Sequence, residues 1–185
     1  MFVRTERLLL RPGWIEDAPA LFRAIADEGI VRNLATAPWP YHPQDAESFL
    51  SRERSTADAS TLIFLRGEAE PVLIGGMGFG RMEQGGVEFG YWLRRDHWGR
   101  GFATEAGRAF LAAARDSLRL RRIEAGHFLD NPASGRVLEK LGFRPTGAIV
   151  PRFSLARGET APCREMKLTL AADEEVEACP AAMAA

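Results

Sequence analysis

The chain of 185 residues has only two cysteines and no long run of apolar residues. Cys163 and Cys179 lack the spacing of a metal-binding pair, and so low a cysteine content is typical of a reducing compartment. A membrane-spanning helix needs about 20 consecutive apolar residues, and the sequence has no such stretch. The first residues also lack the pattern of a secretory signal peptide. These absences predict a cytoplasmic protein that is not associated with a membrane.

The charge of the chain is nearly balanced overall but is uneven along its length. The formal net charge is −1, and the last fifteen residues carry four acidic side chains and no basic one. Without those four, 24 basic residues face 21 acidic ones, an excess too small to predict nucleic-acid binding. The composition is that of an ordinary globular domain. We expect one domain over residues 1–170 and an acidic, mobile tail over residues 171–185.

Hydrophobic periodicity and turn residues divide the first 170 residues into strands and helices. The expected strands are 8–10, 61–66, 71–82, 86–94, 122–129, 143–150 and 163–170. The expected helices are 15–26, 44–57, 102–118 and 132–141. Helices separate strands on both sides of an antiparallel hairpin around residues 83–85. This order predicts a mixed α/β (α+β) sheet, and neither an internal repeat nor a second domain is evident.

The most specific local feature is the segment His97–Ala106, which lies between an expected strand and an expected helix. The first N–H groups of a helix have no partner within it, and the helix dipole places partial positive charge there. Gly99 and Gly101 remove the β-carbons that would keep an anion away, and Arg100 can add a full charge. The segment therefore favours phosphate binding over a simple tight turn before a helix.

A second glycine-rich run, Gly75–Gly80, does not match the dinucleotide-binding fingerprint. That fingerprint needs glycines at its first, third and sixth positions, at the start of a helix. Here the glycines lie within an expected strand that leads into a hairpin. The sequence also contains no Gly-Lys-Ser/Thr, which excludes a P-loop.

Five segments in order resemble the GNAT superfamily of acetyl-CoA-dependent N-acetyltransferases, and more narrowly the subgroup of ribosomal-protein alanine N-acetyltransferases. They are Thr5–Arg11, Glu88–Leu93, Trp98–Ala106, Asn131–Ser134 and Glu139–Phe143. The resemblance extends from about Thr5 to Leu170. It departs from the family at Asp96, because the superfamily's loop often starts with Gln or Arg. An acid is unfavourable beside a pyrophosphate, so we expect Asp96 to point away.

The resemblance implies a sheet that splays around an acetyl-CoA cleft, with helices on both faces. Acetyl-CoA would lie between the strands 86–94 and 122–129, with its pyrophosphate on Trp98–Ala103. Its pantetheine would pair with the open edge of Glu88–Leu93 as an extra strand would. The expected cofactor-binding residues are Tyr91, Trp92, Leu93, Trp98, Gly99, Arg100, Gly101, Phe102, Ala103, Thr104 and Asn131.

Acetyl transfer to an amine needs a neutral amine, a polarised thioester carbonyl and a proton for the leaving thiolate. Glu88 is the candidate base, although a glutamate on a solvated strand face is an equal interpretation. Backbone N–H groups near Tyr91 and Trp92 could hold the developing oxyanion. Ser134 is the candidate proton donor, or else a polar residue in a helical turn capped by Asn131. Other members of the family use a tyrosine as this donor, and no equivalent tyrosine is evident here.

Other reactive or aromatic side chains are expected to have structural roles. The three histidines stand far apart and do not form a metal-binding pattern, so we expect no metal. His97 and His127 are expected to pack, and Cys163 to be a buried strand residue. Trp39 and Tyr41, in a proline-rich loop, would line an acceptor pocket or anchor the loop to the core.

The function that the resemblance implies is direct transfer of an acetyl group from acetyl-CoA to a primary amine. The amine could belong to a protein N-terminus or to a small molecule, and a homodimer would fit the subgroup. Acceptor specificity is assigned to two loops, around residues 35–43 and 151–162. The alternative is a non-catalytic acyl-CoA sensor, which would keep the phosphate loop and lack the chemistry.

Overall fold

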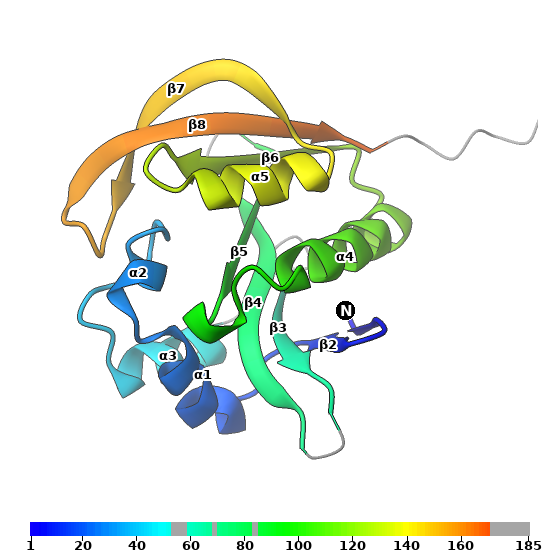
Figure 1. Ribbon diagram of the computed structural model, residues 1–185, viewed down its shortest axis with the longest axis vertical. Coiled ribbons are helices and arrows are strands. Elements are labelled where there is room, and N and C mark those ends of the chain that lie inside the picture. Colours follow the sequence, from blue (N-terminus) through cyan, green and yellow to red (C-terminus); the bar gives the residue numbers. More distant parts are fainter. Residues whose placement is uncertain (53–58, 68–69, 83–84, 171–185) are drawn as a thin grey trace, which may run out of the picture.

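The computed structural model describes residues 1–52, 59–67, 70–82 and 85–170 (Figure 1). The expected acidic tail and the end of the helix expected over residues 44–57 lie outside the described residues. None of the described helices is long and apolar enough to cross a membrane.

The described strands form one sheet of eight, in the order β1-β2-β3-β4-β5-β6-β8-β7. The strands are β1 (Val3–Arg4), β2 (Leu8–Arg11), β3 (Ser60–Leu65), β4 (Val72–Arg81), β5 (Val87–Leu93), β6 (Arg122–Phe128), β7 (Arg144–Ser154) and β8 (Glu159–Thr169). The helices are α1 (Ala18–Ile25), α2 (Glu28–Val31), α3 (Pro43–Ser51), α4 (Phe102–Leu118) and α5 (Pro132–Lys140), with 3-10 turns at Ile15–Asp17 and Arg95–His97. Neighbouring strands are antiparallel except β5 and β6, which confirms the mixed sheet.

The helices cover both faces of the sheet, as expected (Figure 1). Successive strand residues point to opposite faces, so β3 contributes to two separate cores. Ile63 packs into the core beneath α4 and α5, whereas Leu62 and Phe64 pack with α1, α2 and α3. Each face of the sheet is therefore closed by its own apolar layer.

The helix expected over residues 102–118 forms with those bounds, and the next helix starts at its expected cap. The side chain of Asn131 accepts a hydrogen bond from the Ser134 amide at 3.2 Å, and Pro132 follows the cap. Gly142 ends α5 with a φ of +93°, a conformation that glycine adopts without steric cost.

The last two strands are longer than the sequence predicts. The segment 151–162 was expected to be a polar loop between the last two strands, but β7 and β8 run through most of it and leave a turn at 155–158. Pro151 and Pro162 lie opposite each other in the ladder. Pro151 can be accommodated because β7 is the edge strand of the sheet, and Pro162 lies just beyond the residues of β8 that pair with β6. The expected acceptor loop at 151–162 is thus a β-hairpin arm.

The sheet splays between β5 and β6. These parallel strands pair only at Glu88 with Glu124 and at Phe89 with Ala125. Beyond Phe89 the described residues of β5 have no partner strand on that side, and Figure 1 shows β6 and α5 diverging from the end of β5. An open strand edge next to the N-terminus of α4 is the feature around which the site is built.

Candidate active site

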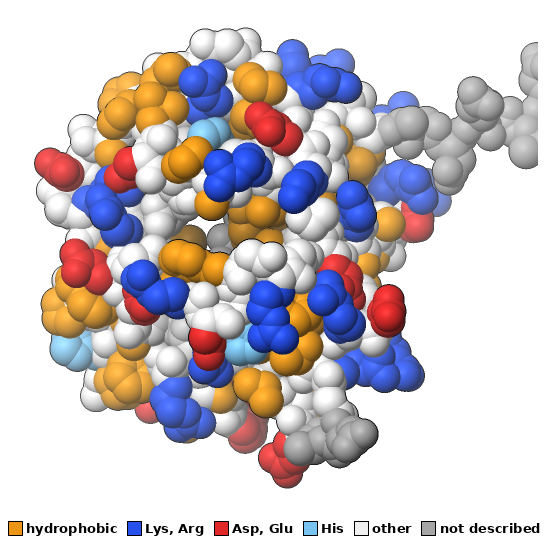
Figure 2. All heavy atoms as spheres, viewed as in Figure 1, with side chains coloured by type: hydrophobic (Ala, Val, Ile, Leu, Met, Phe, Trp, Pro, Cys, Tyr) orange, Lys and Arg blue, Asp and Glu red, His pale blue; other side chains and the backbone are white. Residues whose placement is uncertain are grey.

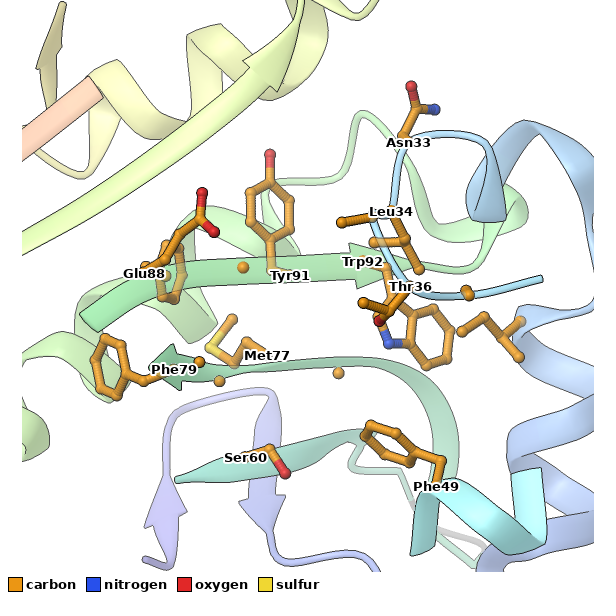
Figure 3. A pocket seen from close by; sticks show the side chains of 18 of the residues that line it. Asn33, Leu34, Thr36, Phe49, Ser60, Met77, Phe79, Glu88, Tyr91 and Trp92 are labelled. Atoms are coloured by element: carbon orange, nitrogen blue, oxygen red, sulfur yellow. The ribbon is translucent and has the colours of Figure 1, made fainter. Parts of the chain in front are cut away.

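Two cavities of about 570 Å³ each lie beside the open end of β5. The first, called here the loop cavity, is bounded by the glycine loop at 98–104, α2 and α5. The second, the sheet cavity, is bounded by β4, β5, β6, α3 and the segment 33–38 (Figure 3). Six residues line both cavities: Asn33, Leu34, Tyr91, Trp92, Asn131 and Ser134. The two cavities therefore meet at the end of β5 and the start of α5.

The glycine loop presents open backbone to the loop cavity. Gly99 and Gly101 have φ values of +71° and +80°, a region that favours glycine. A β-carbon at Gly99 would meet no atom within 4 Å, and one at Gly101 would meet only the Arg7 side chain at 3.7 Å. The Nε1 of Trp98 donates to the carbonyl oxygen of Leu93 at 2.8 Å and attaches the loop to β5. Space and partial positive charge thus coincide at this helix N-terminus.

Residues of the N-terminal segment bind Glu105 in the first turn of α4. Glu105 accepts hydrogen bonds from the Thr5 hydroxyl at 2.6 Å and from Nε of Arg7 at 2.7 Å. Burial would raise the pKa of Glu105, but these bonds outweigh it and lower the pKa. Arg7 also donates to the carbonyl oxygen of Arg100 at 3.3 Å. The sequence signal for this contact was the Thr5–Arg11 match, whose role only the structure explains.

Every expected cofactor-binding residue lines the loop cavity except Arg100. The Arg100 guanidinium lies 5.0 Å from the centre of the Phe102 ring instead. The charge that Arg100 was expected to add to the anion site stays a prediction. The backbone donors of the loop are independent of it.

Asp96 points away from the loop cavity, as expected. Its carboxylate pairs with Arg94 and with Nδ1 of His97, both at 2.7 Å, and its side chain is 57% exposed. His97 is buried and packs against Phe102, so its predicted packing role is also confirmed.

Tyr91 brings a hydroxyl to Ser134 that the sequence interpretation missed. The Tyr91 hydroxyl lies 3.1 Å from Oγ and 3.4 Å from the carbonyl oxygen of Ser134. Burial raises the pKa of Tyr91 to about 12, so the phenol keeps its proton at neutral pH. The sequence made no equivalent of the family's tyrosine evident, whereas the structure places the Tyr91 hydroxyl beside Ser134. The alternation of β5 was the available signal, because it places Tyr91 with Phe89 and Leu93 on the face of α4 and α5.

Glu88 lies in the sheet cavity (Figure 3). Its carboxylate forms an ion pair with Arg152. The two side chains are 29% and 27% exposed, and Arg152 reaches β5 from β7 past Gly126. Nothing in the local sequence identified Arg152, which is 64 residues away along the chain. Glu88 lines only the sheet cavity, whereas Ser134 lines both.

The remaining candidates have the expected structural roles except Trp39. Nδ1 of His127 donates a hydrogen bond to the carbonyl oxygen of Phe128 at 3.0 Å, and the ring packs against Gly135 of α5 and lines the sheet cavity. Cys163 is buried, and burial raises the pKa of its thiol. Tyr41 is buried in the core beneath α1 and also lines the sheet cavity, which supports both interpretations of it. Trp39 is 41% exposed and lines neither cavity.

Comparison with known proteins agrees with this architecture. Residues 7–144 match the family described as "Acetyltransferase (GNAT) domain". The chain is 33% identical over 149 residues to an uncharacterized N-acetyltransferase, p20, of Bacillus licheniformis, covering 78% of this chain and 83% of that protein. It is 32% identical over 120 residues to a ribosomal-protein-serine acetyltransferase of Escherichia coli (strain K12), covering 60% and 65%.

A solved structure of a ribosomal L7/L12 alpha-N-protein acetyltransferase in complex with coenzyme A has the same fold. It superimposes with a TM-score of 0.75 at 18% identity, covering 94% of this chain and 100% of that one. The alternative of a non-catalytic sensor finds no support in these relatives. The chain is therefore an acetyltransferase that belongs to the GNAT family and resembles its ribosomal-protein N-acetyltransferases.

Proposed function

We propose that this protein transfers an acetyl group from acetyl-CoA directly to a primary amine, on a protein N-terminus or a small molecule. The observation that carries the proposal is the shared wall of the two cavities at Tyr91, Trp92, Asn131 and Ser134. A donor in the loop cavity and an acceptor in the sheet cavity would meet there without either having to cross the protein. This arrangement supports direct transfer of the acetyl group from donor to acceptor. Because the two cavities adjoin, the group does not have to be carried between them on a side chain of the enzyme.

The loop cavity fits the donor on two independent grounds. The open backbone at Gly99 and Gly101 can receive a diphosphate at the N-terminus of α4. The edge of β5 beyond Phe89 has no partner strand among the described residues, so an extended pantetheine can pair with it as a strand would. Bound acetyl-CoA supplies a thioester, whose carbonyl carbon accepts the amine and whose sulfur leaves as a thiol.

Three groups of this chain would perform the proton transfers and charge stabilisation. Glu88 removes a proton from the acceptor ammonium, directly or through water, from its position in the sheet cavity. Backbone N–H groups of β5 near Tyr91 and Trp92 donate to the thioester oxygen as it gains charge. The Ser134 hydroxyl donates a proton to the departing sulfur. The ion pair with Arg152 holds the Glu88 carboxylate in place.

An amine panel tests the proposed reaction. The purified protein is incubated with acetyl-CoA and peptides of different N-terminal residues, free amino acids, polyamines or aminoglycosides. Released CoA is measured by thiol titration, and the product is identified by its mass. We expect at least one class of amine to gain an acetyl group, while the same amine blocked beforehand gains none. Binding of acetyl-CoA without turnover of any amine would instead favour the sensor function. A cytoplasmic location and a homodimer stay predictions from the sequence.

A further inference from the structure

The walls of the loop cavity carry four cationic side chains, and they differ in how their charge is compensated. Arg32 pairs with Asp130 at 3.1 Å, and Arg95 pairs with Asp27 at 2.7 Å. Arg95 also donates through Nε to the second oxygen of Asp27 at 2.8 Å. Asp27 therefore compensates the charge of Arg95, whereas Asp130 also binds Arg157 at 2.9 Å and compensates Arg32 only in part. The four cationic residues are Arg32, Arg95, Arg136 and Lys140.

Arg136 and Lys140 have no ion-pair partner among the residues that the structure describes. They stand four residues apart on α5, so they share one face of the helix, and both are exposed. That face lines the loop cavity across from the glycine loop. In Figure 2, Lys and Arg side chains lie over α5 along the rim of the hollow at the centre of the view. Two positive charges without an ion pair among the described residues thus stand together on the wall that faces the loop.

The two walls of the cavity match the two anionic groups of CoA. The N-terminus of α4 offers backbone N–H groups, which suit the diphosphate. The wall of α5 offers two full positive charges on flexible side chains, which suit a phosphomonoester dianion. CoA carries one such group, the 3′-phosphate of its ribose. A single diphosphate on the loop would leave the charges of α5 without a partner.

We propose that Arg136 and Lys140 form a subsite for the 3′-phosphate of CoA, by which the protein selects CoA thioesters over dephospho-CoA and pantetheine thioesters. The proposal rests on acetyl-CoA being the donor. It adds that donor recognition extends beyond the diphosphate loop to the exposed face of α5. The contribution of this subsite falls as ionic strength rises, because exposed charges are screened.

Calorimetric titration with two ligands that differ only in the 3′-phosphate tests the subsite. Wild-type protein is expected to bind acetyl-CoA about tenfold or more tightly than acetyl-dephospho-CoA, since each hydrogen bond to a charged group contributes to this preference. The double substitution Arg136→Ala and Lys140→Ala should weaken acetyl-CoA binding by about the same factor. Binding of acetyl-dephospho-CoA should change less than about twofold.

A matched control separates the subsite from a general effect of charge. Arg122→Ala with Arg144→Ala also removes two exposed positive charges, from β6 and β7, at positions that line neither cavity. This control should keep the preference for acetyl-CoA. Circular dichroism and thermal unfolding of both double variants confirm that α5 and the fold are retained.

Two outcomes would overturn the inference. One is equal affinity of wild-type protein for the two ligands, and the other is a double variant that binds both ligands more weakly by one common factor. Either result leaves the proposed function standing if the wild type still acetylates an amine. Failure of wild-type protein to bind acetyl-CoA at all would remove both proposals.

Discussion

The hydroxyl of Tyr91 lies 3.1 Å from Oγ of Ser134 and joins the open end of β5 to the first turn of α5. Both residues line both cavities, so the pair stands where donor and acceptor would meet. Burial raises the pKa of Tyr91 to about 12, which keeps the phenol protonated and able to donate to Ser134. The Ser134 hydroxyl is then free to direct its own proton into the site.

Tyr91→Phe removes this hydroxyl and keeps the ring. We expect kcat to fall by about tenfold while KM for acetyl-CoA changes little, because Ser134 loses the group that orients it. Ser134→Ala should have a similar effect, and the double variant should be no worse than the slower single one. Steady-state kinetics of the three variants measures this. Losses that multiply in the double variant would show that the two hydroxyls act independently.

Glu88→Gln tests the base. The neutral amide can keep a hydrogen bond to Arg152 but cannot take a proton, so kcat/KM should fall by roughly ten- to thousand-fold. The acidic limb of the pH–rate profile should change, and affinity for acetyl-CoA should stay near that of the wild type. Glu124→Gln is the control, because Glu124 pairs with Glu88 in the sheet but lines neither cavity. An active Glu88 variant with an unaltered profile would assign proton removal to another group.

Thr104→Glu tests the diphosphate position on the glycine loop. Thr104 is half-buried in the first turn of α4 and lines the loop cavity. A negative charge there should weaken acetyl-CoA binding by about tenfold or more, since it opposes the ligand's own charge. The same charge is favourable to a helix N-terminus, so thermal stability should not fall. Thr104→Gln has nearly the same size without the charge, and equal binding by the two variants would contradict the assignment.

Asp17→Asn tests an ion pair that holds the first helical segment to β2. Arg11 donates to both carboxylate oxygens of Asp17, at 2.7 and 2.8 Å, and its guanidinium lies between Trp14 and Phe64. Burial would raise the pKa of Asp17, but the bonds from Arg11 and from the Trp14 amide outweigh it and lower the pKa. We expect the variant to lose about 2–4 kcal/mol of unfolding free energy at neutral pH.

The same pair predicts a pH dependence of stability. Because the pKa of Asp17 is lower in the folded state than its ordinary value of 3.8, the unfolded state binds more protons in acid. The contribution is present above 3.8 and is lost as pH falls through the lower folded pKa. Urea unfolding between neutral and strongly acidic pH should therefore show a steeper loss for wild type than for Asp17→Asn. Parallel curves would contradict the role of this carboxylate.

The sequence by itself determined the parts of the site that depend on neighbours along the chain. The helix at 102–118 and the cap at Asn131 followed from glycine, proline and apolar spacing, because capping and periodicity act within a few residues. The same local signals placed the glycine loop between β5 and α4, whereas the outward orientation of Asp96 was expected from the family resemblance. The splayed sheet followed from the family resemblance, which covers most of the chain.

Only the tertiary structure decided which distant side chains share the site. Arg152 meets Glu88 because β7 and β8 extend as a long hairpin over Gly126, and no local pattern encodes a contact across 64 residues. The Tyr91 side chain extends from β5 to Ser134 in the first turn of α5, a contact between residues 43 positions apart in the chain. The segment 151–162 was interpreted as a polar loop, yet it forms strands, because Pro151 lies on the edge strand β7 and Pro162 lies beyond the residues of β8 that pair with β6. Contacts of this kind depend on strand register and on the angle between elements, which hydrophobic periodicity does not specify.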